Sequence, residues 1–190
     1  MPQRKFKSLV VVFVGEKLAG KEMAACYLAR RHGFANYRFS LILDDILGRL
    51  GLKVSRLNEM NLAGALRERF GASVLAEAIR SSIRQRGLRR VVVDGLRHPA
   101  ELDLLKSVPG FMLVYLTAPL EVRYRRALQR KEKAGESRFS LADFRREEKL
   151  PTEVFIHSLG RKTKVRLDNS GTLKDLYQQI EDKIVRKYIK

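Results

Sequence analysis

Residues 15–22 have the sequence Gly15-Glu16-Lys17-Leu18-Ala19-Gly20-Lys21-Glu22. This stretch directly follows the apolar run 8–14 and precedes a segment, 23–31, whose pattern predicts a helix. It matches G-x-x-x-x-G-K-[ST] except at the last position, where Glu22 replaces a hydroxyl side chain. Glycines let the backbone approach a phosphate, and consecutive N–H groups at a helix N-terminus point toward it. The stretch therefore predicts a phosphate-binding loop between a buried strand and a helix.

Further apolar runs predict four more strands, at 37–40, 91–93, 111–116 and 164–167. The continuous apolar character of 91–93 and 111–116 is typical of parallel strands that are covered on both faces. Helical patterns lie at 41–50, 56–70, 72–86, 99–107, 120–133, 141–149 and 173–190. Strands that alternate with helices predict an α/β fold with a doubly wound, five-stranded parallel sheet.

The length of 190 residues suits one α/β domain with a substantial core. We expect a single domain over 1–190, with a helical insertion at about 41–86 and a small helical lid at about 123–149. Residues 131–140, which lie between two charged helical patterns, are the best candidate for a flexible part of the lid.

The net charge of +18 and the pI near 10.4 predict attraction to polyanions. Nucleic acid, a membrane surface and a phosphate-rich substrate all remain open as partners. The single cysteine, Cys26, excludes an internal disulfide and a cysteine metal cluster. The sequence has no apolar stretch long enough to cross a bilayer and no signal-peptide core, so we expect a cytoplasmic protein without a membrane span.

Doubly wound sheets bind ligands at the carboxyl ends of their strands. Polar or glycine residues follow every predicted strand, so these positions are the candidates for a site. Beyond residues 15–22, they are Ser40 and Asp44, Asp94 and Arg97, Thr117, and Asn169 with Gly171.

Lys21 is the strongest catalytic candidate, because at this spacing it can reach the β and γ phosphates of a nucleotide. Glu22 can hold Mg²⁺ as a hard oxygen ligand; the alternative is a loop that has lost its metal. Asp94 can bind the Mg²⁺ shell or accept the proton of an attacking hydroxyl, although Asp-Gly is also a common turn dipeptide. Arg97 can clamp a substrate phosphate bidentately.

Three arginines, Arg123, Arg126 and Arg130, recur on one face of a predicted helix. Phosphoryl transfer needs several cations around the migrating group, because its charge spreads over the equatorial oxygens. A solvated basic face or an RNA-binding face would have the same pattern. We interpret Arg126 and Arg130 as catalytic residues of the lid. The three histidines have no metal-ligand spacing.

The chain resembles the P-loop kinases of small metabolites, especially dephospho-CoA kinase and the deoxynucleoside monophosphate kinases. Four stretches carry the resemblance: 15–22, Phe39-Ser40-Leu41-Ile42-Leu43-Asp44-Asp45, Asp94-Gly95-Leu96-Arg97, and Asp168-Asn169-Ser170-Gly171-Thr172-Leu173. Only the first is a specific motif. The Gly-Lys-acid sequence at 20–22 also resembles the animal-type phosphomevalonate kinases and some phage nucleotide kinases.

The resemblance implies a P-loop NTPase fold of the nucleoside monophosphate kinase type that uses ATP and Mg²⁺. It implies that Gly15, Gly20, Lys21 and Glu22 bind the ATP phosphates and Mg²⁺. We also expect Ala19 and Met23 in the nucleotide site and Asp94 as a second metal ligand. The resemblance also implies nucleotide contacts by Arg123, Asn169 and Gly171, and a place for Asp44 near the acceptor. We expect Ser40 and Arg97 to bind the acceptor beside Asp44.

Our first hypothesis is therefore a kinase that moves the γ-phosphoryl of ATP to a small acceptor, such as dephospho-CoA or a nucleoside monophosphate. The alternative is a degenerate P-loop module that holds a nucleotide while its basic surface binds RNA or another polyanion. A P-loop NTPase that acts on a partner protein is a third and weaker interpretation, because the chain is short.

Overall fold

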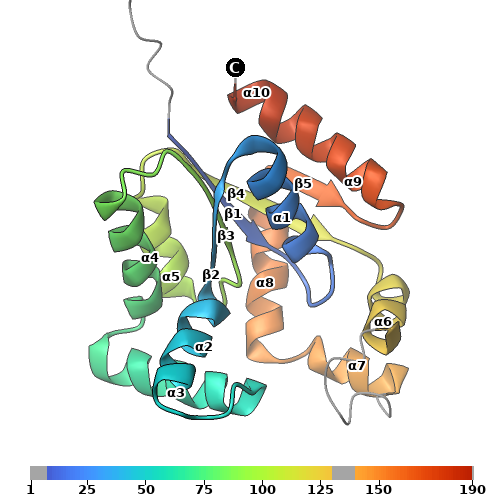
Figure 1. Ribbon diagram of the computed structural model, residues 1–190. Helices are drawn as coiled ribbons and strands as arrows, with labels where there is room; N and C mark the ends of the chain where they lie inside the picture. Colours follow the sequence, from blue (N-terminus) through green and yellow to red (C-terminus); the bar gives the residue numbers. More distant parts are fainter. Residues whose placement is uncertain (1–7, 130–139, 190) are drawn as a thin grey trace, which may run out of the picture. The chain divides into compact units, whose positions relative to one another are not determined.

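The computed structural model describes residues 8–129 and 140–189 (Figure 1). Five strands form one parallel sheet in the order β2-β3-β1-β4-β5, flanked by helices. They are β1 (Leu9–Val14), β2 (Ala35–Arg38), β3 (Arg90–Asp94), β4 (Phe111–Thr117) and β5 (Val165–Asp168). The predicted α/β fold with a doubly wound, five-stranded parallel sheet is confirmed.

The helices are α1 (Lys21–His32), α2 (Phe39–Arg49), α3 (Arg56–Phe70), α4 (Val74–Gln85), α5 (Pro99–Lys106), α6 (Leu120–Gln129), α7 (Leu141–Glu147), α8 (Pro151–Lys162), α9 (Leu173–Ile180) and α10 (Arg186–Tyr188). A π-helical turn, η2 (Glu181–Val185), separates the last two. All six residues of β1 are buried, as a parallel strand covered on both faces requires.

The boundaries differ from the sequence prediction in three places. Strand β2 ends at Arg38, and the buried Phe39 starts α2, so Ser40 lies in a helix rather than at a strand end. Helix α8 was not predicted, although Pro151 at its first position and the buried Ile156 and Leu159 are typical of an amphipathic helix. The predicted helix 173–190 is interrupted by η2.

The chain divides into two compact units, which we describe separately. Unit 1 comprises residues 1–12 and 28–112, and unit 2 comprises 13–27 and 113–190. Strands β1 and β4 and helix α1 contribute residues to both. The single domain predicted over 1–190, with its insertion and lid, stays a prediction.

In unit 1, β2 pairs with β3 so that Arg38 lies opposite Asp94 at the carboxyl ends of both strands. Helix α4 packs against α5, and α3 packs against α2 and α4 (Figure 1). The buried residues of α4 are Leu75, Ala76, Ile79 and Ile83, which form an apolar stripe along the helix.

In unit 2, β4 pairs with β5 in register from Val114 opposite Val165 to Thr117 opposite Asp168. Helix α8 packs closely on the Tyr115 ring at Gly160. A Cβ at this position would overlap the ring. The guanidinium carbon of Arg166 lies 4.9 Å from the centre of the same ring. Within the described parts of the chain, no helix is both long and apolar enough to cross a bilayer.

Candidate functional site

The loop of unit 2 lies between β1 and α1, as the sequence predicts, and Lys21 is the first residue of the helix. The Lys21 Nζ donates hydrogen bonds to the carbonyl oxygens of Gly15 and Glu16, both at 2.8 Å. The ammonium group therefore lies against the first two residues of the loop. The loop and its lysine thus lie at the predicted place between a strand and a helix, and their role in phosphate binding stays a prediction.

The two glycines of the motif are required by geometry. Gly15 has a φ of 153°, and a Cβ on it would overlap the carbonyl oxygen of Leu116. Gly20 has a φ of 104°, and a Cβ there would overlap the side-chain amide nitrogen of Asn169. Any larger residue at either position would force the loop away from its neighbours.

Leu18, the fourth residue of the loop, has a φ of 63° and is the only non-glycine residue with a positive φ in the described chain. Its carbonyl oxygen accepts a hydrogen bond from Arg126 Nη1 at 3.2 Å. Arg126 Nη2 donates to the Asn169 carbonyl oxygen at 2.8 Å. Burial, with a smaller contribution from the charge of Arg125, lowers the pKa of Arg126. Arg126 thus joins the loop to the segment after β5.

Asn169 is buried, and its side-chain amide donates to the Ala19 carbonyl oxygen at 2.8 Å. Its backbone N–H donates to the Thr117 carbonyl oxygen, also at 2.8 Å. The Asn169 Oδ1 atom is buried without a hydrogen-bond partner among the described residues. Gly171 follows in the same connection and is exposed. The segment after β5 therefore supports the loop 15–22 directly and presents one acceptor without a partner among the described residues.

Arg123 is held by protein groups on every side of its guanidinium. It is buried; Nη1 and Nη2 each donate to one oxygen of Glu148 at 2.8 Å, and Nε donates to the Ala118 carbonyl oxygen at 2.9 Å. Burial works against the charge of Arg123, but the hydrogen bonds and charge of Glu148 outweigh it and raise the Arg123 pKa. The predicted contact of Arg123 with nucleotide stays a prediction. In this structure Arg123 joins α6 to Glu148, which directly follows α7.

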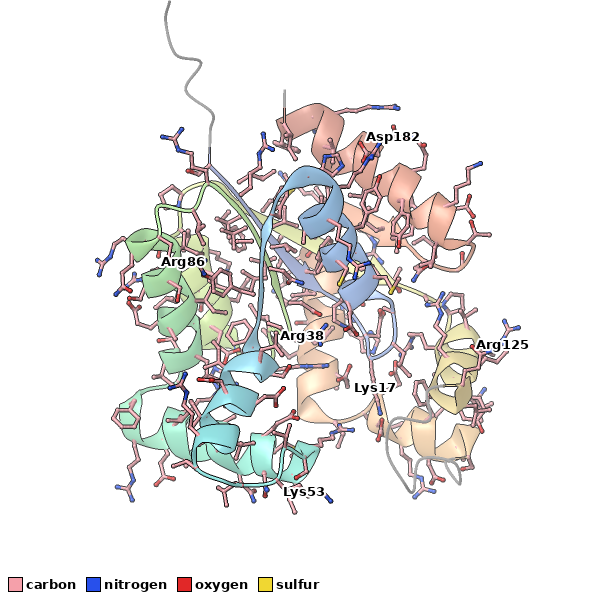
Figure 2. All side chains as sticks on the ribbon, viewed as in Figure 1. Lys17, Arg38, Lys53, Arg86, Arg125 and Asp182 are labelled. Atoms are coloured by element: carbon pink, nitrogen blue, oxygen red, sulfur yellow. The ribbon has the colours of Figure 1, made fainter. Side chains whose placement is uncertain are left out.

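The remaining predicted nucleotide residues vary in accessibility. Ala19 is fully buried in the loop and Met23 is exposed on α1. Glu22 lies half-buried in the first turn of α1, where a negative charge suits the helix dipole. Arg130 lies outside the described residues. Figure 2 shows Arg125 extending outward from α6.

The predicted acceptor residues lie in unit 1. Ser40 and Asp44 lie on α2, and the Asp44 Oδ1 atom is buried with no hydrogen-bond partner in the described chain. Asp94 is the last residue of β3 and is 6% exposed; its Oδ1 accepts a hydrogen bond from the Gly95 N–H at 2.7 Å. Its Oδ2 lies 3.9 Å from Arg38 Nε.

Sequence reasoning missed Arg38, which is labelled in Figure 2. Its position at the end of β2, two residues before Ser40, was the available signal. The prediction placed the end of this strand two residues too late, so the sequence directed attention to Ser40 instead. The register Arg38 opposite Asp94 brings a cation to the carboxylate at the ends of two neighbouring strands.

Arg97 lies between β3 and α5, and its backbone N–H donates to Glu101 Oε2 at 3.2 Å. Glu101 is fully buried and forms an ion pair with Arg67 of α3 at 2.6 Å. His98 caps α5 by accepting from the Ala100 N–H at 3.2 Å. A buried carboxylate therefore fixes the backbone that carries Arg97.

Mg²⁺ is commonly held by one or two carboxylates together with water and substrate phosphates. Glu22 of unit 2 offers such an oxygen, and Asp94 of unit 1 separately offers another; the metal role predicted for each stays a prediction. No group of three or more metal-binding side chains occurs in the described residues. The donor chemistry therefore fits a metal that arrives with a nucleotide rather than one that the protein holds alone.

No family model matches the chain. It is 28% identical over 183 residues to the UPF0200/UPF0201 protein of Archaeoglobus fulgidus, a match covering 93% of this chain and 55% of the relative. It is also 28% identical over 183 residues to the UPF0200 protein of Methanosarcina acetivorans, covering 95% and 96%. The chain thus spans about half the length of the first relative and nearly all of the second.

Among solved structures, shikimate kinase from Bacteroides thetaiotaomicron is similar, with a TM-score of 0.58 and 12% identity over 92% of this chain and 95% of that one. Dephospho-CoA kinase from Campylobacter jejuni has a TM-score of 0.56 and 14% identity over 95% and 97%. The chain therefore has the fold of the P-loop kinases, and the resemblance inferred from residues 15–22 is confirmed at the level of fold.

Proposed function

We propose that the protein is a P-loop kinase that transfers the γ-phosphoryl group of ATP to a small metabolite. The observation that carries the proposal is the loop of unit 2, in which Lys21 Nζ is held by two loop carbonyls at 2.8 Å. Lys21 would move from these carbonyls to the β and γ phosphates when a nucleotide binds. The likeness in fold to shikimate kinase and dephospho-CoA kinase supports this proposal.

The nucleotide would be bound by the loop backbone and by the segment after β5. The N–H groups at the start of α1 would bind the phosphates, and Arg126 would stabilise the negative charge that develops during transfer. Arg130 would add a second cation. The unused Asn169 Oδ1 would accept a hydrogen bond from the base, and Gly171 would leave room beside it.

The acceptor would be bound by unit 1. Asp94 is buried and polar at a strand end, and it would accept the proton of the acceptor hydroxyl. Arg97 would bind an anionic group of the acceptor, and Ser40 and Asp44 would bind its polar groups. Dephospho-CoA and nucleoside monophosphates are the acceptor classes that the resemblance to P-loop kinases suggests.

Mg²⁺ would be held by Glu22 together with the nucleotide phosphates. When bound, the ion would neutralise charge on the transferring group. Glu22 takes the position at which a hydroxyl is usual, so its charge would compensate more of the ion's charge than a serine would.

The direct test is ADP release measured against a panel of small alcohols and monophosphates, with wild-type protein and Lys21→Ala. We expect acceptor-dependent turnover in the wild type and at least about a hundredfold less in the variant, because a charge contact to the transition state is lost. The far-ultraviolet circular dichroism spectra of the two should coincide. Equal turnover in both proteins would rule out the proposed function.

A second function, binding of RNA or another polyanion, is favoured by a separate observation in unit 2. Arg161, Lys162 and Lys164 are exposed and directly precede β5, whereas Asn169 follows its carboxyl end. These three cations therefore lie at the opposite end of β5 from the nucleotide segment, where the proposed reaction does not use them.

The test of this second function is RNA affinity as a function of salt. A steep fall of log affinity with log salt indicates release of counterions from phosphates. Replacement of Arg161, Lys162 and Lys164 by glutamine should flatten the slope by about one to three, roughly one for each lost phosphate contact. A slope that stays the same would exclude this surface, and anionic vesicles would show whether a membrane is bound instead.

A further inference from the structure

The carboxylate of Glu16, the second residue of the loop, turns inward to β4 of unit 2. Glu16 is 5% exposed, and its Oε1 accepts hydrogen bonds from the Tyr115 hydroxyl at 2.5 Å and from Thr117 Oγ1 at 3.1 Å. Its Oε2 is buried and has no hydrogen-bond partner among the described residues. A negative charge is thus buried within a loop whose proposed ligand is itself anionic.

A series of polar side chains continues from the Glu16 carboxylate. His157 of α8 has its Nδ1 at 3.6 Å from Glu16 Oε1 and its Nε2 at 3.2 Å from Glu148 Oε2. Glu148 forms the bidentate pair with Arg123, and Arg123 Nη1 reaches the Lys17 carbonyl oxygen at 3.4 Å. This series of side-chain contacts therefore begins in the loop at Glu16 and returns to the loop at Lys17.

Both ends of this series act on the backbone that holds the catalytic lysine. The carbonyl oxygen of Glu16 accepts from Lys21 Nζ at 2.8 Å, while the side chain of Glu16 is fastened to β4 and its neighbour Lys17 to Arg123. A carboxylate that accepts two hydroxyl donors is a strong anchor for a peptide group.

We infer that Glu16 is a positioning residue of the phosphate-binding loop, and that Tyr115, His157, Glu148 and Arg123 hold it in place. This inference rests on the proposed function, since it assigns Glu16 to the orientation of the loop and of Lys21 for a nucleotide phosphate. Glu16 does not itself touch the nucleotide. The small displacement that its loss allows is enough to weaken phosphate binding.

The state of Tyr115 agrees with this geometry. Burial, together with the hydrogen bond and the charge of Glu16, raises the pKa of Tyr115. The phenol therefore keeps its proton and remains a donor to Glu16 throughout the range in which the enzyme would work.

The experiment is calorimetric titration of ADP into wild-type protein, Glu16→Gln, Tyr115→Phe and Lys21→Ala. We expect Glu16→Gln to bind ADP on the order of tenfold more weakly, because a charged anchor is replaced by a neutral one. Tyr115→Phe keeps the carboxylate and removes one donor, so its affinity should fall about threefold. Binding in place of turnover keeps the result independent of the acceptor.

Ile156→Val is the matched control for stability. Ile156 is fully buried on α8 and precedes His157 in the sequence. Its replacement by valine removes one methylene from the core of unit 2 and leaves the side chains from Glu16 to Arg123 unchanged. Its ADP affinity should equal that of the wild type. If Glu16→Gln loses no more affinity than a control variant of equal stability, the inference is wrong.

The outcomes separate the inference from the proposed function. If Lys21→Ala loses ADP binding and Glu16→Gln binds ADP as tightly as the wild type or more tightly, the inference about Glu16 is wrong, while the proposed function still stands. Absence of ADP binding by the wild type overturns the proposed function and the inference with it. Should Glu16→Gln fail to fold, Tyr115→Phe decides, and an unchanged affinity in that variant overturns the inference.

Discussion

The residues at the strand ends of unit 2 and those of unit 1 are held in different ways. In unit 2, Lys21, Asn169 and Arg126 each donate hydrogen bonds of 2.8 Å to carbonyl oxygens of the loop or of its supporting segment. In unit 1, Asp94 accepts a hydrogen bond from the N–H of its neighbour Gly95, and its Oδ2 lies 3.9 Å from Arg38 Nε. Buried side-chain oxygens without a partner in the described chain occur in both units, among them Asp44 Oδ1 in unit 1 and Asn169 Oδ1 in unit 2.

This difference fits the two tasks that we propose. A phosphate-binding loop receives the same group in every nucleotide kinase, so it gains from being built before the nucleotide arrives. An acceptor site has to complete its polar contacts with one particular molecule. The variants below each change one unit. We expect changes in unit 2 to weaken ADP binding, and the change of Asp94 in unit 1 to lower turnover.

Gly15→Ala should have the largest effect, because the loop cannot form around a Cβ that overlaps the Leu116 carbonyl oxygen. We expect a loss of stability of at least about 3 kcal/mol and no ADP binding. Urea unfolding and ADP titration measure both quantities.

Gly48→Ala on α2 is the matched control in unit 1, since nothing lies within 4 Å of an added Cβ and its φ is not positive. It should stabilise the protein by about 0.5–1 kcal/mol. If Gly15→Ala is as stable as Gly48→Ala, the loop of unit 2 can accommodate a Cβ beside Leu116, which contradicts the close contact described above.

Asp94→Asn should separate the two units most clearly. The amide keeps the shape and can still accept from the Gly95 N–H, but it cannot accept a proton from the acceptor. We expect turnover to fall by about 10²–10⁴ while ADP affinity stays within twofold of the wild type. A parallel loss of ADP affinity would show that Asp94 serves the nucleotide instead.

Asn169→Ala should weaken ADP binding without changing which acceptor is used. The variant leaves the Ala19 carbonyl oxygen without its donor and removes the packing against Gly20. The expected loss is on the order of tenfold, as for one buried hydrogen bond of about 1–2 kcal/mol. Asn36→Ala, at an exposed position of β2, should leave ADP affinity and KM for the acceptor unchanged. An acceptor KM that rises in Asn169→Ala would contradict the division of tasks.

The sequence predicted the fold and the loop because both depend on local patterns. The strand, the glycines and the lysine of residues 8–22 are contiguous, and their geometry follows from short-range constraints on the backbone. The strand-end rule likewise selected Asp94 and Asn169, which lie buried at the ends of β3 and β5.

The series of polar side chains from Glu16 to Arg123 could not be predicted in this way. Its members come from residues as far apart as 16 and 157, and only the packing of α8 brings His157 between two carboxylates. Helix α8 itself was missed, so His157 had no place in the predicted fold. The helical spacing that grouped Arg123 with Arg126 and Arg130 also could not reveal that Glu148 holds the Arg123 guanidinium.

The smallest expected effect is a change in the free energy of unfolding at acid pH, which tests the ion pair between Glu148 and Arg123 in unit 2. Burial alone would raise the pKa of Glu148, but the hydrogen bonds and charge of Arg123, with a lesser part from His157, outweigh it and lower the pKa below its ordinary 4.5. A lowered carboxylate pKa stabilises the folded state above the unfolded-state pKa. This contribution is lost as the pH falls below about 4.5 and through the folded value.

Urea unfolding between pH 7 and pH 3 measures this contribution, with Glu148→Gln as the comparison. The wild type should be the more stable at pH 7, and its advantage should shrink below about pH 4.5, because the variant has no proton to take up at this position. Asp45→Asn, which removes an exposed ion pair with Arg49 on α2, should follow the wild type at every pH. A constant difference between wild type and Glu148→Gln would mean that the charge of Glu148, paired with Arg123, adds no pH-dependent stability to unit 2.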